Sequence, residues 1–332
     1  MTYDFRTVVD PGEYGSAIGV DTRVFLTGSC FSGNIGHKFL EHRFPAMVNP
    51  FGVLYNPFSI ARVLERVKEQ TYCREEELVG HEGLWHHFDF HGRFSNTNQE
   101  TVCRDINRTI NETNSFLESA GFLIITFGTS YVYERIETGE VVANCHKFPS
   151  GDFYRYRLEP DEIVSLYKEL IVSLRLFNPQ LKIIFTVSPV RHWKDGAHGN
   201  QLSKSVLHLA IDKLCDLFDK VWYFPAYEIL MDELRDYRFY SDDMFNPSAL
   251  AVDYIWDRFG DSLLTSRARQ FATRAKKLAQ ARQHRFLGAD ENSHVRFLQN
   301  SIELVGDIER QFPEADLKED RRYFEKLLDR YL

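Results

Sequence analysis

The sequence lacks any run of about 18 apolar residues, the length that a membrane-spanning helix needs, and its first six residues contain no apolar core of a secretion signal. Its cysteines number only five, an odd count, with no Cys-x-x-Cys pair and no Cys/His ligand spacing. These absences argue against a membrane protein, a disulfide framework and a structural zinc site. We therefore expect a cytoplasmic protein whose free thiols must each be judged by their surroundings.

Positive charge is also scarce, because 40 Lys and Arg face 48 Asp and Glu and leave a net charge of −8. Such a balance repels phosphate backbones, so we expect no nucleic-acid partner. One segment departs from it: residues 266–285 contain seven Lys/Arg and no Asp/Glu. We interpret that segment as a solvated helix packed on the edge of the domain rather than as an anion-binding surface.

Four continuous apolar runs of strand length recur along the chain, at residues 24–26, 122–127, 183–187 and 221–224. Continuous runs, unlike alternating ones, are typical of strands buried on both faces of a parallel sheet. Helical patterns lie around them, at residues 59–69, 107–119, 160–177 and 204–218. This alternation predicts a three-layer α/β/α fold with a doubly wound parallel sheet, in which ligands bind beyond the carboxyl ends of the strands.

Two parts of the chain depart from that alternation. Residues 70–104 contain the stretch Trp85 to His91 and are expected to form an insertion of short antiparallel strands that folds over the site as a small lid. From Asp257 onward the chain is helical and highly charged. We therefore predict an α/β domain over residues 1–265, with the insertion at about 70–104, and a helical C-terminal extension over residues 266–332.

The strongest local signal is the stretch from Val24 to Gly36, which reads as an apolar strand, a tight turn of small residues and the start of a helix. Gly28 allows a sharp turn, and the following helix N-terminus offers unpaired N–H groups that favour a thiolate or an oxyanion. Cys30 stands at that point, where a helix N-terminus lowers a thiol pKa. We take Cys30 as the candidate nucleophile and Ser29 as the alternative; a thiol that only packs the turn is the non-catalytic interpretation.

The stretch Gly28-Ser29-Cys30-Phe31, followed by Asn34-Ile35-Gly36, resembles the signature of the GSCFA domain family, which is grouped with the SGNH/GDSL hydrolases. Further stretches resemble the family pattern in order: Asn49-Pro50-Phe51-Gly52, Asp89-Phe90-His91, Phe127-Gly128-Thr129-Ser130, Asn144-Cys145-His146-Lys147, Ser188-Pro189-Val190-Arg191-His192 and Asp242-Asp243-Met244. The resemblance extends from Val24 to the region of Arg285. It implies an SGNH hydrolase (flavodoxin-like) fold and either hydrolysis or acyl transfer on a small-molecule or carbohydrate acyl ester, with no cofactor.

In GDSL-type enzymes the turn reads Gly-Asp-Ser, so the resemblance puts Ser29 in the place of the Asp and Cys30 in the place of the nucleophile. It also implies an oxyanion hole made of the Cys30 N–H, the Gly52 N–H and the side chain of Ser130, which stands where an Asn is usual. Asn144 or Asn200 is a possible source of the missing amide. Substrate contacts are expected from His91, Asn144, His146 and Arg191.

The general base is the point at which this chain departs from the pattern. SGNH enzymes carry Asp-x-x-His, whereas this chain reads Asp243-Met244-Phe245-Asn246. An amide has no titrating nitrogen and accepts no proton at neutral pH. Three explanations stay open: an impaired enzyme, an inactive ligand-binding protein, or a different base, for which His192 and His146 are the candidates.

A metal site is the remaining possibility for the histidine-rich insertion. His87, Asp89 and His91 alternate along an extended segment and share one face. Without a Cys or paired carboxylates beside them this is a poor ligand set, and we expect no metal. The sequence leaves the oligomeric state and the identity of the substrate open.

Overall fold

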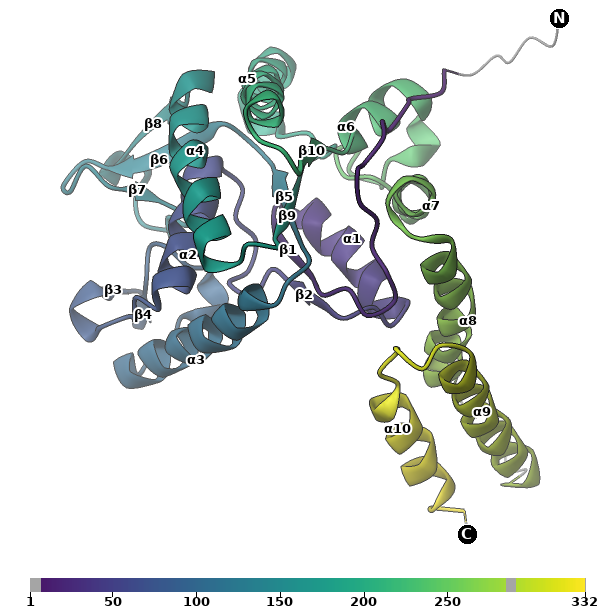
Figure 1. The fold of residues 1–332 in the computed structure, drawn as a ribbon. Coiled ribbons are helices and arrows are strands. Elements are labelled where there is room, and N and C mark those ends of the chain that lie inside the picture. Colours follow the sequence, from purple (N-terminus) through teal and green to yellow (C-terminus); the bar gives the residue numbers. More distant parts are fainter. Residues whose placement is uncertain (1–6, 285–290, 332) are drawn as a thin grey trace, which may run out of the picture.

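The computed structural model describes residues 7–284 and 291–331. Its centre is a parallel sheet of five strands: β1 (Val24–Gly28), β2 (Ala46–Val48), β5 (Phe122–Phe127), β9 (Lys182–Val187) and β10 (Val221–Tyr223). Their order is β2-β1-β5-β9-β10 and every pairing is parallel (Figure 1). This is the flavodoxin-like strand order, so the predicted fold class is confirmed.

Helices cover both faces of this sheet. On one face, Phe25, Leu123 and Ile183 share a core with α2 (Pro57–Glu69), α3 (Gln99–Glu118), α4 (Pro160–Phe177) and α5 (Gly196–Leu217). On the other face, their neighbours Leu26, Ile124 and Ile184 pack with α1 (Cys30–Glu41) and α7 (Ala249–Leu263). Because successive strand residues point to opposite faces, both faces need apolar residues, and the continuous apolar runs follow from that.

Helix boundaries differ from the periodicity at two places. Helix α3 begins at Gln99, earlier than predicted, because the Asn98 side chain caps it by accepting the Thr101 N–H at 2.8 Å. Helix α5 begins at Gly196 rather than Lys204. The first turns of both helices are polar, so an apolar repeat does not reveal them. By contrast, α4 has the predicted bounds, with Pro160 at its first position.

Two small antiparallel sheets accompany the central one. Residues 70–104 contain the hairpin of β3 (Val79–His81) and β4 (Leu84–His86), as expected, together with the start of α3. The sequence did not predict the second sheet, formed by β6 (Tyr131–Arg135), β7 (Val141–Val142) and β8 (Phe153–Arg157) in the order β7-β6-β8. It follows β5 in the chain, so it lies near the carboxyl end of the central sheet (Figure 1).

The chain after β10 is helical: α6 (Ala226–Glu228) continues into a π-turn (Ile229–Glu233), and α7 leads to α8 (Ser266–Gln283), α9 (Glu291–Gln311) and α10 (Lys318–Leu328). The last three extend away from the sheet (Figure 1) but share the apolar core of α1 and α7 through Phe271, Leu298 and Phe324.

Three basic residues of α8 are paired within the protein: Arg267 with Glu314 at 2.5 Å, Arg269 with Asp261 at 3.1 Å and Arg282 with Asp320 at 3.3 Å. Such pairing agrees with a solvated helix on the domain edge; Arg285 lies outside the described residues. Across residues 7–284 and 291–331, no helix has the length and apolar character needed to cross a membrane.

Candidate active site

The predicted strand, turn and helix around Cys30 are present, and glycine is essential to their geometry. Gly28 ends β1 with a φ of +134°, and a Cβ there would lie 2.2 Å from the Thr126 backbone oxygen of β5. Ser29 follows in an extended conformation as the N-cap residue, and α1 begins at Cys30. The turn therefore brings the start of α1 to the carboxyl ends of β1 and β5, the edge of the sheet at which this fold binds ligands.

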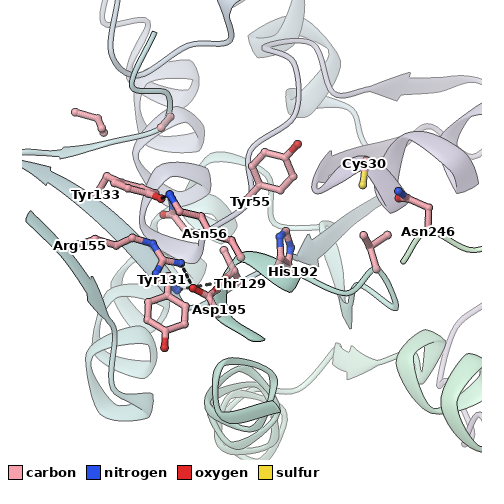
Figure 2. A pocket seen from close by; sticks show the side chains of 14 residues that line it. Cys30, Tyr55, Asn56, Thr129, Tyr131, Tyr133, Arg155, His192, Asp195 and Asn246 are labelled. Carbon is pink, nitrogen blue, oxygen red and sulfur yellow. Dashed lines mark hydrogen bonds and ion pairs between the residues drawn. The ribbon is translucent and has the colours of Figure 1, made fainter. Parts of the chain in front are cut away.

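A cavity of about 340 Å³ opens beside this turn (Figure 2). Its lining comprises Cys30, Tyr55, Asn56, Thr129, Tyr131, Tyr133, Val142, Ala143, Arg155, Val190, His192, Lys194, Asp195 and Asn246. Three of the predicted residues meet here from distant parts of the chain: Cys30 from α1, His192 from the segment after β9, and Asn246 from the loop before α7. The opposite wall comes from the β6–β8 sheet, whereas no residue of the 70–104 insertion lines the cavity.

Cys30 faces the cavity with competing influences on its thiol. The N–H groups of Cys30 and Phe31 and the nearby charge of Lys204 favour the thiolate and lower the pKa, but burial outweighs them and raises the pKa of Cys30 above its ordinary value. The expected lowered pKa is therefore wrong in direction. The helix N-terminus acts as predicted, but the sequence did not show how far the turn is enclosed.

Ser29 lies beside Cys30 but points into the protein. Its side chain is fully buried, and its hydroxyl has no hydrogen-bond partner among the described residues. A Cβ built on Gly128 would lie 3.2 Å from Ser29 Cβ and 3.4 Å from His192 Nε2, so Ser29 and His192 both flank Gly128. Cys30 lines the cavity and Ser29 does not.

His192 is held at the cavity wall by its backbone and its ring. Its N–H donates to Asn200 Oδ1 at 2.9 Å, and its ring meets Tyr55 edge-on with centroids 5.7 Å apart. Burial, helped by the positive charge of Lys204, lowers the pKa of His192 to about 4. The imidazole is therefore neutral at pH 7, and its Nε2 is buried without a partner in the described structure.

Asn246 occupies the position where the resemblance predicts a histidine, and it lines the same cavity as Cys30 (Figure 2). Its Nδ2 donates to Asp243 Oδ2 at 2.6 Å, and its backbone N–H donates to Asp243 Oδ1 at 2.9 Å. These bonds, together with the Phe245 N–H, hold the pKa of Asp243 well below its usual range. The chain thus keeps an orienting carboxylate, but the group that it orients is an amide.

The predicted oxyanion residues Gly52 and Ser130 lie outside the cavity lining. The Gly52 N–H donates to Asn49 O at 2.8 Å, and His91 covers the glycine so closely that a Cβ would lie 2.3 Å from His91 Cβ. The fully buried Ser130 hydroxyl bonds to Ser203 Oγ at 3.2 Å. Near the Cys30 sulfur, the N–H groups of Cys30 and Phe31 are the donors that the structure brings together.

The remaining candidate residues are placed around the cavity rather than in it. His146 is buried, and its ring Nε2 lies 2.9 Å from His87 O. The backbone N–H of His146 donates to Asn144 Oδ1 at 2.9 Å. Arg191 lines a separate groove. Neither Asn144, His146, His91 nor Arg191 lines the cavity that contains Cys30.

Sequence reasoning missed Lys204, a fully buried residue of α5. Its Nζ donates to Gly128 O at 2.7 Å and to Ser188 O at 2.6 Å, so it joins the residues that follow β5 and β9. Burial lowers the pKa of Lys204 to about 7. A signal was available, because Lys204 falls on the apolar stripe of α5 that continues with Leu207 and Ile211.

The described residues contain one group with metal-ligating atoms close together: atoms of Cys73, Glu77 and His87 lie within 4.8 Å of one another. Both Glu77 oxygens accept from Arg66 at 3.1 Å, and His87 Nδ1 accepts the Asp89 N–H. The Cys73 sulfur lies 3.2 Å from that of Cys103, whereas His87 Nε2 is buried without a partner among the described residues. The group lies outside the lining of the Cys30 cavity.

The amino-acid sequence matches two models of one protein family. The sequence model of the GSCFA family matches residues 23–259, and that of the GSCFA domain protein C-terminal domain matches residues 275–330. The comparison with curated proteins finds no match.

Two solved structures are similar at low identity. A carbohydrate esterase family 3 protein from Talaromyces cellulolyticus is 9% identical with a TM-score of 0.37, covering 76% of this chain and 98% of that one. An acetyl xylan esterase from the rumen bacterium Butyrivibrio proteoclasticus is 14% identical with a TM-score of 0.31, covering 74% of this chain and 64% of that one. At these scores neither carries an inference about activity. The family match extends over most of the sequence, including every residue that lines the Cys30 cavity, and the chain belongs to the GSCFA family.

Proposed function

We propose that this protein is an SGNH-type hydrolase or acyltransferase that acts on a small-molecule or carbohydrate acyl ester, with Cys30 as its nucleophile. One observation carries the proposal: Cys30, His192 and Asn246 line the same cavity at the carboxyl end of the parallel sheet. A nucleophile, a neutral imidazole and an oriented amide in one enclosed site are a combination suited to acyl transfer.

In the proposed reaction the Cys30 sulfur attacks the ester carbonyl carbon and a carbon–sulfur bond forms. The thiol proton passes to His192 Nε2 and then to the departing alkoxide, which leaves as the alcohol. Water or an acceptor hydroxyl attacks the resulting thioester and gives its proton to His192. The carbon–sulfur bond then breaks, the acid or the new ester leaves, and His192 returns the proton to the Cys30 sulfur. The developing oxyanion is stabilised by the N–H groups of Cys30 and Phe31 at the start of α1.

The presence of a thiol agrees with the missing histidine at position 246. A thiol is far more acidic than a serine hydroxyl and needs less assistance from a base. Cys30 also faces the cavity, whereas the Ser29 side chain is fully buried. These two observations favour Cys30 over Ser29 as the attacking group.

The test is covalent labelling with p-nitrophenyl acetate, followed by peptide mapping in a mass spectrometer. We expect an acetyl adduct on Cys30 that disappears in Cys30→Ala and persists in Cys145→Ala, a matched control because Cys145 is also a partly exposed free thiol. An adduct lost in Ser29→Ala and kept in Cys30→Ala would assign the nucleophile to Ser29. Labelling spread equally over the exposed thiols would contradict the proposal.

One observation supports a second candidate, a protein that binds an acyl ester without turning it over. Asn246 holds the place of the base, and its amide is fixed by Asp243. For such a protein, saturable binding of the ester without release of the alcohol is the expected result. Release of p-nitrophenol at a rate that Cys30→Ala abolishes would exclude it.

A further inference from the structure

A second cavity, of about 580 Å³, lies on the other side of the wall that carries His192; we call it the Arg191 groove. It is lined by Arg191, Trp193, Leu230, Met231, Leu234, Arg235, Asp236, Tyr237, Tyr240, Met244 and Phe245. The Arg191 N–H donates to Phe245 O at 3.1 Å and ties the two segments of the wall together. Side chains alternate across this wall: His192 and Asn246 line the Cys30 cavity, whereas Arg191, Trp193 and Phe245 line the groove.

Arg191 is poorly satisfied within the protein. Among the described residues, its Nη1 donates to the Met231 sulfur at 3.7 Å and its buried Nε has no acceptor. No described carboxylate pairs with it, whereas Arg235 in the same groove pairs with Asp232 at 3.3 Å. A partly buried guanidinium without an anion is unfavourable, and its planar fork of donors matches a carboxylate or a phosphate.

Aromatic rings surround this cation. Trp193 is 50% exposed and stacks on Phe245, with centroids 5.2 Å apart and planes at 27°. Tyr237, which is 77% exposed, and Tyr240 continue the aromatic lining, with centroids 6.3 Å apart. Exposed aromatic faces over an apolar floor suit a ring-shaped ligand, and the C–H face of a sugar ring stacks on such surfaces.

We propose that the Arg191 groove binds the anionic, ring-bearing part of the substrate, as in an acyl ester of a sugar acid or a sugar phosphate. The carboxylate or phosphate pairs with Arg191 and the ring lies against Trp193, and the proposal requires the acyl group of the same ester to reach over the rim of the wall to Cys30. This inference rests on the proposed acyl-ester function for the link to Cys30. Beyond that function, the inference specifies the negative charge and the ring shape of the part of the ester that carries the acyl group.

The test is calorimetric binding of three unreactive probes to the full chain: trigalacturonate, which carries carboxylates, glucose 6-phosphate and neutral galactotriose. We expect an acidic probe to bind, the neutral one to bind at least about tenfold more weakly, and Arg191→Met to remove that difference. Binding of trigalacturonate alone would assign a carboxylate, and binding of glucose 6-phosphate alone would assign a phosphate. The conservative Arg191→Lys variant, which keeps the charge but loses the fork, should bind the acidic probe with intermediate affinity.

Arg104→Met serves as the matched control, because Arg104 is an exposed arginine on α3 outside the groove. Equal binding of the acidic and neutral probes, or unchanged binding in a folded Arg191→Met protein, would overturn the inference. The probes contain no ester, and the experiment is repeated in Cys30→Ala. Probe binding together with no labelling of wild-type Cys30 by p-nitrophenyl acetate would reject the proposed function and keep the groove. Labelling of wild-type Cys30 without probe binding to either protein would keep the proposed function and reject the groove.

Discussion

Asn246 donates a 2.6 Å hydrogen bond from Nδ2 to Oδ2 of Asp243, three residues before it in the chain. Asp243 also accepts the backbone N–H of Asn246 at 2.9 Å, so the carboxylate fixes both the loop and the side chain that it presents. In an Asp-x-x-His arrangement the same carboxylate would orient an imidazole and stabilise its protonated form. The loop before α7 is therefore organised for a base that this chain does not carry.

Asn246→His should complete that arrangement. A histidine at position 246 would retain Asp243 as its partner and face Cys30 across the cavity, and a positioned general base typically contributes about 10²- to 10⁴-fold in rate. We expect kcat/KM for p-nitrophenyl acetate to rise by at least about tenfold, a threshold set below that range because the hydrogen-bond donors of the oxyanion site stay unchanged. Steady-state release of p-nitrophenol measures the change.

The double variant Asp243→Asn with Asn246→His is the control, because it introduces the imidazole without its carboxylate partner. It should lose most of the gain. If Asn246→His alone leaves the rate at the wild-type value while the protein stays folded, proton transfer at this position does not limit the reaction.

The pH dependence of Cys30 alkylation follows from its buried surroundings. Burial raises the pKa of the thiol above its ordinary value, so Cys30 is protonated at pH 7 and its thiolate fraction grows as the pH rises. The rate of modification by iodoacetamide should rise from pH 7 upward without levelling off below about pH 8.5, the ordinary thiol pKa. Peptide mass spectrometry measures the rate at Cys30 alone. A plateau below pH 8 would indicate a thiolate stabilised more strongly than the described contacts provide.

Much of the fold could be predicted from the sequence because buried parallel strands leave a continuous apolar run. Residues 122–127 form β5 with the predicted bounds, and Phe122 to Phe127 are all buried. The β6–β8 sheet escaped prediction because β6 and β8 are mostly half-exposed and rich in Tyr and Arg, and the buried β7 is only two residues long. No apolar periodicity marks such strands.

The site was predictable where a residue follows a strand or stands in a motif of the family. Cys30 and His192 follow strands that end at the same sheet edge, Asn246 stands in a family motif, and the cavity contains all three. Lys204 and Arg155 enter the site from a helix and from the small sheet, so sequence distance from the turn gives no hint of them. The hydrogen bonds of Gly52 and Ser130 depend on tertiary neighbours, His91 and Ser203, that a motif cannot specify.

Gly128→Ala should disturb the site through space rather than through backbone conformation. The new methyl carbon would lie 3.0 Å from Tyr55 O, 3.2 Å from Ser29 Cβ and 3.4 Å from His192 Nε2. The Tyr55 backbone oxygen accepts the N–H groups of Gly128 and Thr129, and these two hydrogen bonds restrict how far it can move away from a new methyl group. We therefore expect a loss of about 1–3 kcal/mol in unfolding free energy. Urea unfolding measures the loss, with Gly151→Ala as the control because a Cβ there meets nothing within 4 Å. Equal stability of the two variants would contradict the close approach of Ser29, Tyr55 and His192 to Gly128.

Lys204→Met should change how stability depends on pH. Burial lowers the pKa of Lys204 in the folded protein to about 7, whereas an unfolded lysine titrates near about 10.4. Between these values the unfolded chain binds a proton that the folded protein has released, so the lysine makes the unfolding free energy rise with pH, by up to about 1.4 kcal/mol per unit. Methionine removes this contribution. The unfolding free energy of the wild type minus that of the variant should therefore increase between pH 7 and 10.

The comparison is made by urea unfolding of both proteins at pH 7 and pH 9.5. Subtracting the variant cancels the buried tyrosines and thiols that both proteins share; with pKa values raised by burial, these lower the stability as pH rises. Loss of Lys204 also leaves the Gly128 and Ser188 oxygens without their donor, at a cost of about 1–3 kcal/mol each. That cost is present at both pH values, so it lowers the unfolding free energy of the variant equally at each and does not alter how that free energy depends on pH. A difference that does not change with pH would mean that Lys204 stays protonated in the folded protein, and its charge would then favour a thiolate at Cys30 throughout this range.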